Sequence, residues 1–470
     1  MIELPRAFAE RMKLLLGGEY EAFCDALCNE ESVKGLRVNT HKTAIGEFVE
    51  NSPFGLEKID YVEGGYIVSN EAMAGKHPYH HAGAYYMQDP GAMSAVASVP
   101  AEFWEREGLR VLDLCAAPGG KTTQLAALCA ENGGAVLSNE YVSARSRILS
   151  GNVERMGLKN VVVTNLDSKF IAEWYPEHFD LVVVDAPCSG EGMYRKNDNA
   201  ISEWSLDNVK MCAERQREII ENAVKNVAEG GYLLYSTCTY STEENEGIVA
   251  EFLDRHPDFS LCPCNSAVSE HTSNGVDVTG GSRPELALCR RFYPHVCRGE
   301  GQFVALLKRE GERGDSVAKD HFTAPDKKEL LVVDSFTKET LGKRLDGICK
   351  VGGNIAVFPL HGILPLPRAG IVSVGVTLGE ERKGRIVPHH HYFTAFGKEF
   401  LSTCSFEAES VEVLKFIAGE EPNVDPSCAG YTALLLEVGN EKITLGGGKA
   451  SGGKLKNYYP KGLRQLNLHR

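Results

Sequence analysis

The sequence contains no run of eighteen apolar residues, so a membrane-spanning helix is not expected. Its first residues, Met1–Arg6, lack the charged and apolar regions of a secretory signal peptide. The 14 cysteines are scattered along 470 residues without the spacing of a small disulfide-rich domain. Together these absences predict a cytoplasmic protein whose cysteines remain free thiols.

Two common ligand motifs are present only in part. Cys262-x-Cys264 and His389–His391 have partial metal-ligand spacing, but neither has a matching second half, so no metal ion is expected. The segment Asp113–Thr122 ends in Gly-Lys-Thr like a P-loop. A P-loop needs a glycine where this chain has Cys115, so binding of a nucleoside triphosphate is not expected.

An excess of positive charge is missing too. The net charge of −14 disfavours a protein that coats nucleic acid, but it allows a nucleic-acid enzyme with a local basic surface. Basic residues do gather near the C-terminus, together with Tyr458 and Tyr459. Two interpretations stay open, a solvated tail and a surface for RNA phosphates. The basic residues are Lys442, Lys449, Lys454, Lys456, Lys461, Arg464 and Arg470.

Strand-like and helical segments alternate between residues 76 and 308, which predicts a parallel sheet built from βαβ units. Strands are expected at 110–114, 135–139, 160–164, 180–185, 231–236 and 303–307, with helices at 121–130, 143–156 and 207–228. The rest of the chain is interpreted as an N-terminal α+β lead (1–75) with a helix at 8–16 and a strand at 36–40, a linker (309–330), and two glycine-interrupted, β-rich subdomains (331–390 and 391–470).

The segment Asp113–Thr122 is the predicted cofactor loop. It follows a strand and opens a helix with small residues, as a Rossmann-type turn does where the backbone approaches a nucleotide-like ligand. Glu140 follows the second strand, where an acid can bind two ribose hydroxyls. Asp167 follows the third strand, where it can face an adenine.

Cys188 and Cys238 each come just after an apolar segment that reads as a buried parallel strand. The carboxyl ends of such strands line the ligand crevice of an open α/β sheet, so both thiols can face one substrate. A thiolate that adds to C6 of a cytosine lets C5 attack a methyl sulfonium, and the thiolate then leaves. Asp185 could hydrogen-bond N3 and the exocyclic amine. The residues alone leave open which thiol attacks, although the Pro187–Cys188 turn favours Cys188.

Three motifs resemble the Nop/Sun family of RNA cytosine-5 methyltransferases: Asp113–Thr122, Asp185–Gly190, and Tyr235–Tyr240 with Glu244–Asn245. Shorter matches to the same family lie at Arg37–Thr40, Tyr85–Pro90, and Arg291–His295 through Gly301. The similarity covers roughly residues 35–308. One departure is Gln302, where the family usually has an aromatic residue, and this change is expected to alter local packing only.

The resemblance implies a Rossmann-like domain that binds S-adenosylmethionine. It assigns the attacking thiolate to Cys238 and the release of the methylated base to Cys188, and it makes Lys121 and Asp185 supports of the active site. The cofactor-binding residues that it implies are Ala116, Ala117, Pro118, Gly119, Gly120, Lys121, Thr122, Glu140, Asp167 and Asp185.

The C-terminal part resembles the bacterial RsmF group, which ends in a PUA-like RNA-binding module and acts on cytosines of 16S ribosomal RNA. The matching residues are Arg368–Gly370, Leu378–Gly379, Lys383–Gly384, Pro388–His389 and Asn457–Arg464. The expected partner is RNA, with 1–75 and the C-terminal module binding it, and a monomer is expected. Two alternatives are a DNA cytosine methyltransferase with Cys188 attacking, and a catalytically silent RNA-binding factor.

Overall fold

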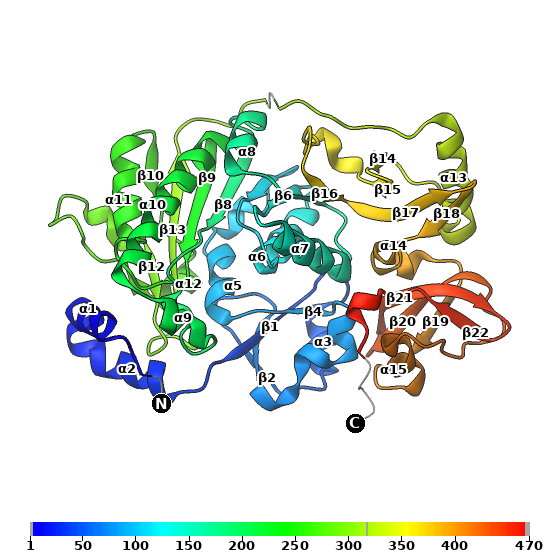
Figure 1. The fold of residues 1–470 in the computed structure, drawn as a ribbon, viewed down its shortest axis with the longest axis horizontal. Coiled ribbons are helices and arrows are strands. Elements are labelled where there is room, and N and C mark those ends of the chain that lie inside the picture. The colour runs from blue at the N-terminus through cyan, green and yellow to red at the C-terminus, as the bar shows by residue number, and fades with distance from the viewer. Residues whose placement is uncertain (1–2, 316–317, 466–470) are drawn as a thin grey trace.

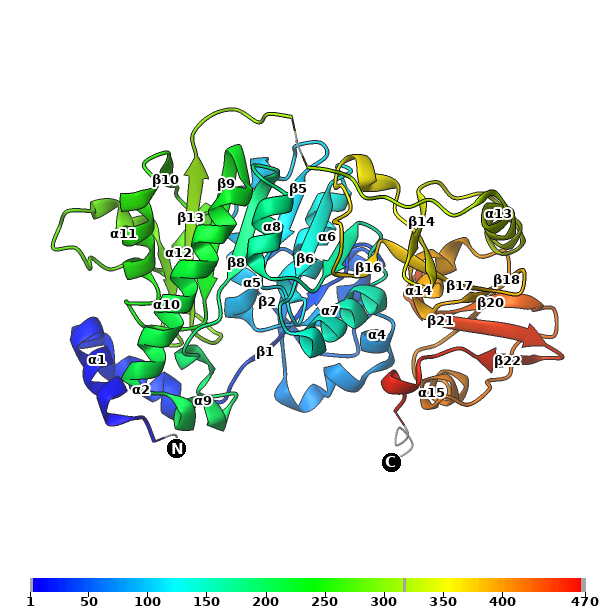
Figure 2. The ribbon, with the colours of Figure 1, turned by 45° about the horizontal axis from the view of Figure 1, so that its top comes forward.

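The computed structural model describes residues 3–315 and 318–465, and its largest sheet has ten strands. Their order is β11-β12-β13-β9-β8-β5-β6-β7-β16, with β10 paired to β13. The bounds of the outer strands are β10 (Phe259–Leu261), β11 (Ser273–Asn274) and β12 (Arg290–Phe292). The five strands β9, β8, β5, β6 and β7 are mutually parallel, and helices cover both faces of the sheet (Figures 1 and 2). This is the Rossmann-like arrangement predicted from the sequence. The central bounds are β5 (Arg110–Asp113), β6 (Ala135–Asn139), β7 (Val161–Thr164), β8 (Phe179–Asp185), β9 (Val227–Thr237) and β13 (Gln302–Arg309).

Both faces of the central sheet are buried, which explains why its strands read as continuous apolar segments. Leu112 and Val182 pack with helices α8, α10 and α11 in one core cluster, whereas the adjacent Val111 and Val183 pack with α5, α6 and α7 in another. The helix bounds are α5 (Pro90–Ala97), α6 (Gly120–Ala130), α7 (Ser143–Met156), α8 (Ser168–Trp174), α10 (Leu206–Ala223) and α11 (Glu246–Arg255).

One expected helix end is wrong. The helix predicted for 207–228 ends at Ala223, a short 3₁₀ turn covers Val224–Asn226, and β9 begins at Val227. Asn226 fixes this turn, because its side-chain amide donates to the carbonyl oxygens of Ile171 (2.9 Å) and Tyr175 (2.8 Å). Tertiary contacts therefore end a helix that the local pattern would continue.

The N-terminal part consists of the helices α1 and α2, the shorter helices α3 (Ile45–Glu50) and α4 (Pro78–His81), and a four-stranded antiparallel sheet of order β2-β3-β1-β4. Strand β4 follows residue 75, so this sheet extends past the boundary proposed from the sequence. The Arg37 side chain on β1 donates to Thr123 Oγ1 (2.7 Å) and the Gly120 carbonyl oxygen (3.2 Å), which fixes the sheet to the start of α6. The bounds are α1 (Arg6–Leu16), α2 (Tyr20–Asn29), β1 (Lys34–Val38), β2 (Leu56–Lys58), β3 (Gly65–Val68) and β4 (Tyr85–Met87).

The C-terminal part is built from two further four-stranded sheets, β14-β15-β17-β18 and β19-β20-β21-β22. Helix α14 (His390–Phe396), at the proposed boundary between the two subdomains, contacts both sheets. Helix α13 (Lys327–Leu341) begins inside the predicted linker, at a capping box formed by Asp326 and Glu329. The strand bounds are β14 (Ile348–Val351), β15 (Asn354–Val357), β17 (Val376–Arg382), β18 (Arg385–Pro388), β19 (Thr403–Phe406), β20 (Gly430–Val438), β21 (Glu441–Ser451) and β22 (Lys454–Asn457).

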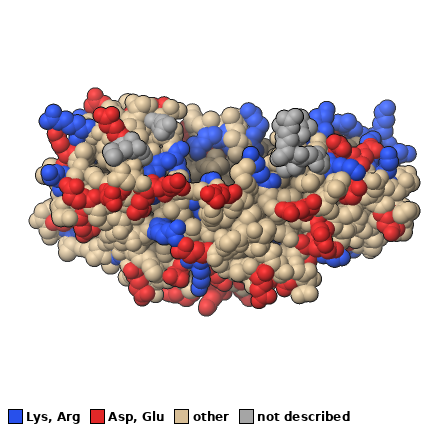
Figure 3. Space-filling view, turned by 90° about the horizontal axis from the view of Figure 1, so that it is seen from below, with Lys and Arg blue, Asp and Glu red and all other residues tan. Residues whose placement is uncertain are grey.

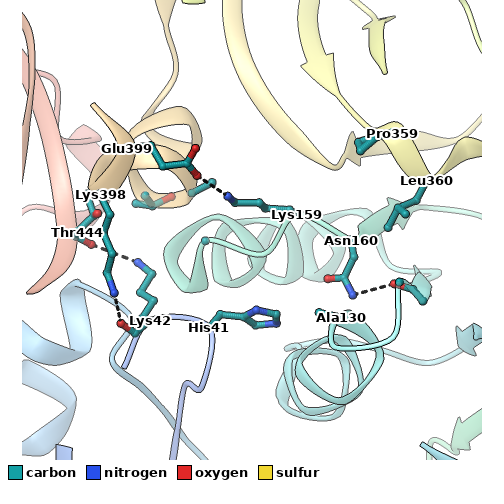
Figure 4. A pocket seen from close by; sticks show the side chains of 15 residues that line it. His41, Lys42, Ala130, Lys159, Asn160, Pro359, Leu360, Lys398, Glu399 and Thr444 are labelled. Carbon is teal, nitrogen blue, oxygen red and sulfur yellow. Dashed lines mark hydrogen bonds and ion pairs between the residues drawn. The ribbon is translucent and has the colours of Figure 1, made fainter. Parts of the chain in front are cut away.

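Strand β16 (Ile371–Val374) ties this C-terminal part to the central sheet, because it pairs antiparallel with β7. A cavity of about 540 Å³ lies where the N-terminal, central and C-terminal parts meet, and its lining includes Lys42, Asn160 and Leu360 (Figure 4). None of the predicted catalytic residues lines this cavity. Lys42 at this cavity donates to the carbonyl oxygens of Ala82, Arg155 and Thr444, at 2.6, 3.1 and 3.2 Å. One buried side chain thus joins the N-terminal, central and C-terminal parts.

The histidine run at 389–391 has a packing role. His390 and His391 are buried in α14, and burial lowers the pKa of each to about 3. His391 Nε2 lies 3.1 Å from the Leu158 carbonyl oxygen. Within residues 3–315 and 318–465 no group of three metal-ligating side chains occurs, and no helix there is long and apolar enough to cross a membrane.

Candidate active site

The predicted catalytic residues meet at the carboxyl ends of β8 and β9. Asp185 is the last residue of β8, and its carboxylate lies 2.7 Å from Lys121 Nζ in the first turn of α6. Ser236 Oγ on β9 donates to Asp185 Oδ1 at 2.9 Å. Because Lys121 is buried, its ammonium group holds the carboxylate in one orientation.

The two cysteine side chains are in direct contact. Cys188 Sγ lies 3.1 Å from Cys238 Sγ, and both residues are partly buried. The turns that carry them are fixed to each other, because Gly192 N donates to the Cys238 carbonyl oxygen (2.9 Å) and Ser189 Oγ lies 2.9 Å from Thr239 Oγ1. The hydrogen bond to Cys238, together with burial, raises the pKa of Cys188. A nucleobase bound beside these two sulfur atoms would therefore contact both thiols.

Glu244 follows the Cys238 turn in the sequence, and its side chain binds the Cys188 turn. Its carboxylate accepts hydrogen bonds from Ser189 N and Gln216 Nε2, both at 2.9 Å, and also from Ser189 Oγ. Burial raises the pKa of Glu244 to about 7, although these donors favour the ionised form. Glu244 is part of the motif that the chain shares with the family, but the sequence alone does not indicate its contacts with Ser189 and Gln216. Its place in the sequence shortly after Cys238 was the available signal.

The cofactor loop is shaped by its small residues and by Asp113. Gly119 has a φ of 115°, which favours glycine, and a Cβ atom on it would lie 3.1 Å from Leu149. Thr122 Oγ1 donates to Asp113 Oδ2 (2.7 Å), so the end of β5 is tied to the start of α6. Burial raises the pKa of Asp113 to about 7, and its Oδ1 atom has no partner among the described residues.

Glu140 and Asp167 lie at the next two strand ends, as predicted. Glu140 is buried, its carboxylate accepts from Val142 N (2.9 Å), and Arg145 lies 3.6 Å away. Asp167 is the N-cap of α8 and accepts from Lys169 N (2.9 Å). Among the described residues, no hydrogen bond or ion pair joins either acid to the cysteines or to Asp185.

Gln302, the departure from the family pattern, reaches the site. It is buried on β13, and its Nε2 atom lies 3.5 Å from Asp185 Oδ1. The expectation that the change affects local packing only is therefore too narrow, since this side chain borders a predicted catalytic residue.

The C-terminal residues expected to bind RNA do not all lie on the surface. Lys449 on β21 and Lys456 on β22 are exposed and directly opposite each other, and Lys449 Nζ lies 5.6 Å from the ring centre of Tyr431. Tyr459, expected to help bind RNA, is instead buried, with its hydroxyl 2.7 Å from His81 Nδ1. It belongs to the core. Arg470 lies outside the described residues.

Comparison with known proteins finds matches to related family models in three parts of the chain. Residues 103–308 match the family described as 16S rRNA methyltransferase RsmB/F. Residues 4–90 match the N-terminal domain of 16S rRNA methyltransferase RsmF, and residues 404–465 match the methyltransferase RsmF PUA domain. The PUA-like C-terminal module predicted from the sequence is thereby confirmed.

Full-length relatives and a solved structure agree with these matches. The chain is 30% identical to ribosomal RNA small subunit methyltransferase F of Aeromonas hydrophila over 94% of each chain, and 29% identical to the Vibrio cholerae protein of the same name over 99% of each. A crystal structure of a methyltransferase homologue from Pyrococcus horikoshii has a TM-score of 0.56 and 27% identity, covering 65% of this chain and 95% of the other. The chain therefore belongs to the ribosomal RNA small subunit methyltransferase F family.

Proposed function

We propose that the protein transfers a methyl group from S-adenosylmethionine to C5 of a cytosine in RNA, and that this RNA is 16S ribosomal RNA. The observation that carries the proposal is the contact between Cys188 and Cys238 beside the Asp185–Lys121 ion pair. Relatives over nearly the full length are named for methylation of small-subunit ribosomal RNA, which supports this substrate. The PUA module supports RNA over DNA.

The residues at the ends of β5, β6 and β7 fit the cofactor. Small residues from Ala116 to Gly120 leave space at the start of α6, and the Asp113 Oδ1 atom is buried with no partner in the part of the chain that the structure describes. Glu140 would accept hydrogen bonds from the ribose hydroxyls, and Asp167 would lie toward the adenine. When bound, S-adenosylmethionine supplies the methyl group that C5 receives.

In the proposed mechanism Cys238 attacks as a thiolate and forms a bond to C6 of the cytosine. The electron pair of the C5–C6 double bond moves through C4 to N3, which takes a proton from water, and the Asp185 carboxylate accepts hydrogen bonds from this N3–H group and from the exocyclic amine. Lys121 keeps the Asp185 side chain in place. After C5 has been methylated, Cys188, whose own proton has first passed to water, takes the C5 proton as a thiolate. The double bond forms again, the Cys238 thiolate leaves, and N3 returns its proton to water.

The assignment of the two thiols rests on the family motif, so it needs a direct test. RNA that carries 5-fluorocytosine at the target position cannot lose its C5 substituent as a proton, so the covalent adduct should persist. Peptide mapping of that adduct should identify Cys238. An adduct on Cys188, or an adduct with DNA but not with RNA, would support the DNA methyltransferase alternative instead.

A further inference from the structure

A cavity of about 430 Å³ lies beside the proposed active site, where the ends of β1, β3 and β4 meet the loop that follows the Cys188 turn. We call it the Met73 pocket, and its side chains include Lys34, Met73, Lys76, Met87, Gln88 and Lys196. Figure 3 shows the molecule from below relative to Figure 1. A hollow lies near the middle of that face, bordered by Lys and Arg side chains and, on its lower side, by Asp and Glu side chains.

Two walls of the Met73 pocket are continuous with the active site. Gln88 packs against Gly120, the first residue of α6, so closely that a Cβ atom there would lie 3.0 Å from the Gln88 amide. Lys196 follows the Cys188 turn in the sequence, after the short 3₁₀ turn Glu191–Met193. A ligand in the pocket would therefore lie next to a base held by the cysteines.

The charges in the Met73 pocket suit an anion. Lys34, Lys76 and Lys196 come from three separate segments, whereas Asp89 is the only acidic residue in the lining. Lys196 is paired with Asp89 at 2.7 Å, and Lys34 donates to the neutral Asn70 carbonyl oxygen at 3.1 Å. The Lys76 ammonium group has no hydrogen-bonding or ionic partner among residues 3–315 and 318–465, so its charge is free to meet a phosphate.

The remaining lining suits the flat face and polar edge of a base. Met73 is 56% exposed and has a φ of 49°, a strained backbone conformation for a residue with a side chain. Thioether groups such as those of Met73 and Met87 pack well against aromatic rings. The Gln88 Oε1 atom is closed off from solvent and has no hydrogen-bonding partner among the described residues, so a rotation of the side chain into the pocket would let it accept an N–H group from a ligand.

From these observations we propose that the Met73 pocket binds the nucleotide adjacent to the target cytosine in the RNA strand. The phosphodiester group lies against Lys34 and Lys76, and the base lies against Met73 and Met87 within reach of Gln88. This inference rests on the proposed function, since it assigns the pocket to the same RNA strand. It makes these side chains determinants of the sequence around the modified cytosine.

The test compares the wild-type protein with Lys76→Ala and Met73→Ala in the full chain, using short RNAs. One set of RNAs carries a single neutral methylphosphonate linkage, and another carries a single abasic nucleotide, on either side of the target. Lys76→Ala should weaken RNA binding about threefold to fivefold and lower the salt slope by about 0.7. Met73→Ala keeps a side chain at the same φ, so it removes only the thioether surface.

The pairing of variant with modified RNA gives the sharpest result. The methylphosphonate that weakens wild-type binding should not weaken Lys76→Ala further, and the abasic nucleotide that weakens wild-type binding should not weaken Met73→Ala further. Lys327→Ala is the matched control, because Lys327 is exposed at the start of α13, lies in the predicted linker and does not line the pocket. Affinity for S-adenosylmethionine should stay the same in all variants.

Two results would overturn the inference while leaving the proposed function intact. In the first, the wild-type protein methylates RNA and both variants respond to every modified RNA as the wild type does. In the second, free cytidine monophosphate protects Lys76 from acylation as well as the RNA does, which would mark a mononucleotide site. Absence of methylation and of adduct formation by the wild-type protein would instead refute the proposed function.

Discussion

Replacing Lys449 and Lys456 together with glutamine tests whether the C-terminal module binds RNA phosphates. Both side chains are exposed and directly opposite each other on β21 and β22, so their charges repel across the strand pair. Among the described residues neither has an acidic partner within ion-pair distance. The double variant should therefore fold at least as stably as the wild type.

The size of the binding effect follows from the number of phosphates released. Each lost contact to single-stranded RNA or to a duplex lowers the slope of log affinity against log salt by about 0.7–0.9, so two contacts lower it by about 1.4–1.8. Between about 50 and about 200 mM salt, the loss of affinity should then be about sevenfold to twelvefold smaller than for the wild type. Fluorescence anisotropy with labelled ribosomal RNA fragments over a salt series measures this slope.

The control removes the same charge elsewhere. Lys327 and Lys328 are exposed at the start of α13, and their replacement with glutamine should leave the slope unchanged. An unchanged slope in the Lys449/Lys456 variant would refute the reasoning and leave these lysines as a solvated surface. Deletion of 331–470 is a poorer test, because it would also remove β16 from the central sheet.

Three further outcomes are expected. Cys188→Ala should accumulate a covalent protein–RNA complex that migrates slowly on a denaturing gel, and wild-type turnover in this variant would contradict the release role. Glu140→Ala should weaken S-adenosylmethionine binding by roughly 1.5–3 kcal/mol, because a charge-assisted hydrogen bond is lost, and unchanged affinity in calorimetry would remove Glu140 from the site. Burial raises the pKa of Glu244 from 4.5 to about 7, so the folded protein should lose about 3 kcal/mol of stability as pH rises through that interval. Unfolding measured across this range should show that dependence reduced in Glu244→Gln, and equal dependence in both proteins would refute it.

The central sheet was predictable because its signals are local. Buried valines at Val161–Val163 and Val182–Val184 mark strands from their own sequence, and a helix follows most of them. The carboxyl ends of parallel strands meet at one edge, so the positions of Cys188, Cys238 and Asp185 followed from the topology alone. The two thiols are in contact because β8 and β9 are adjacent parallel strands that end at the same edge of the sheet.

Other features depend on contacts between distant segments and were not predictable in the same way. Strand β16 is a short apolar segment whose partner, β7, lies about two hundred residues earlier. Tyr459 resembles an exposed aromatic residue in a basic tail, yet His81 and the surrounding core bury it. The link that Glu244 makes between the two cysteine turns also needs the folded structure, since Ser189 and Gln216 are remote in sequence.

The most direct test of the account is the identity of the residue that bonds to the target base. The wild-type protein is incubated with S-adenosylmethionine and ribosomal RNA that carries 5-fluorocytosine, and the adduct is digested and mapped by mass spectrometry. The account predicts a single modified peptide with the base on Cys238, and no adduct in Cys238→Ala. An adduct on Cys188, or an adduct that persists in Cys238→Ala, would contradict it.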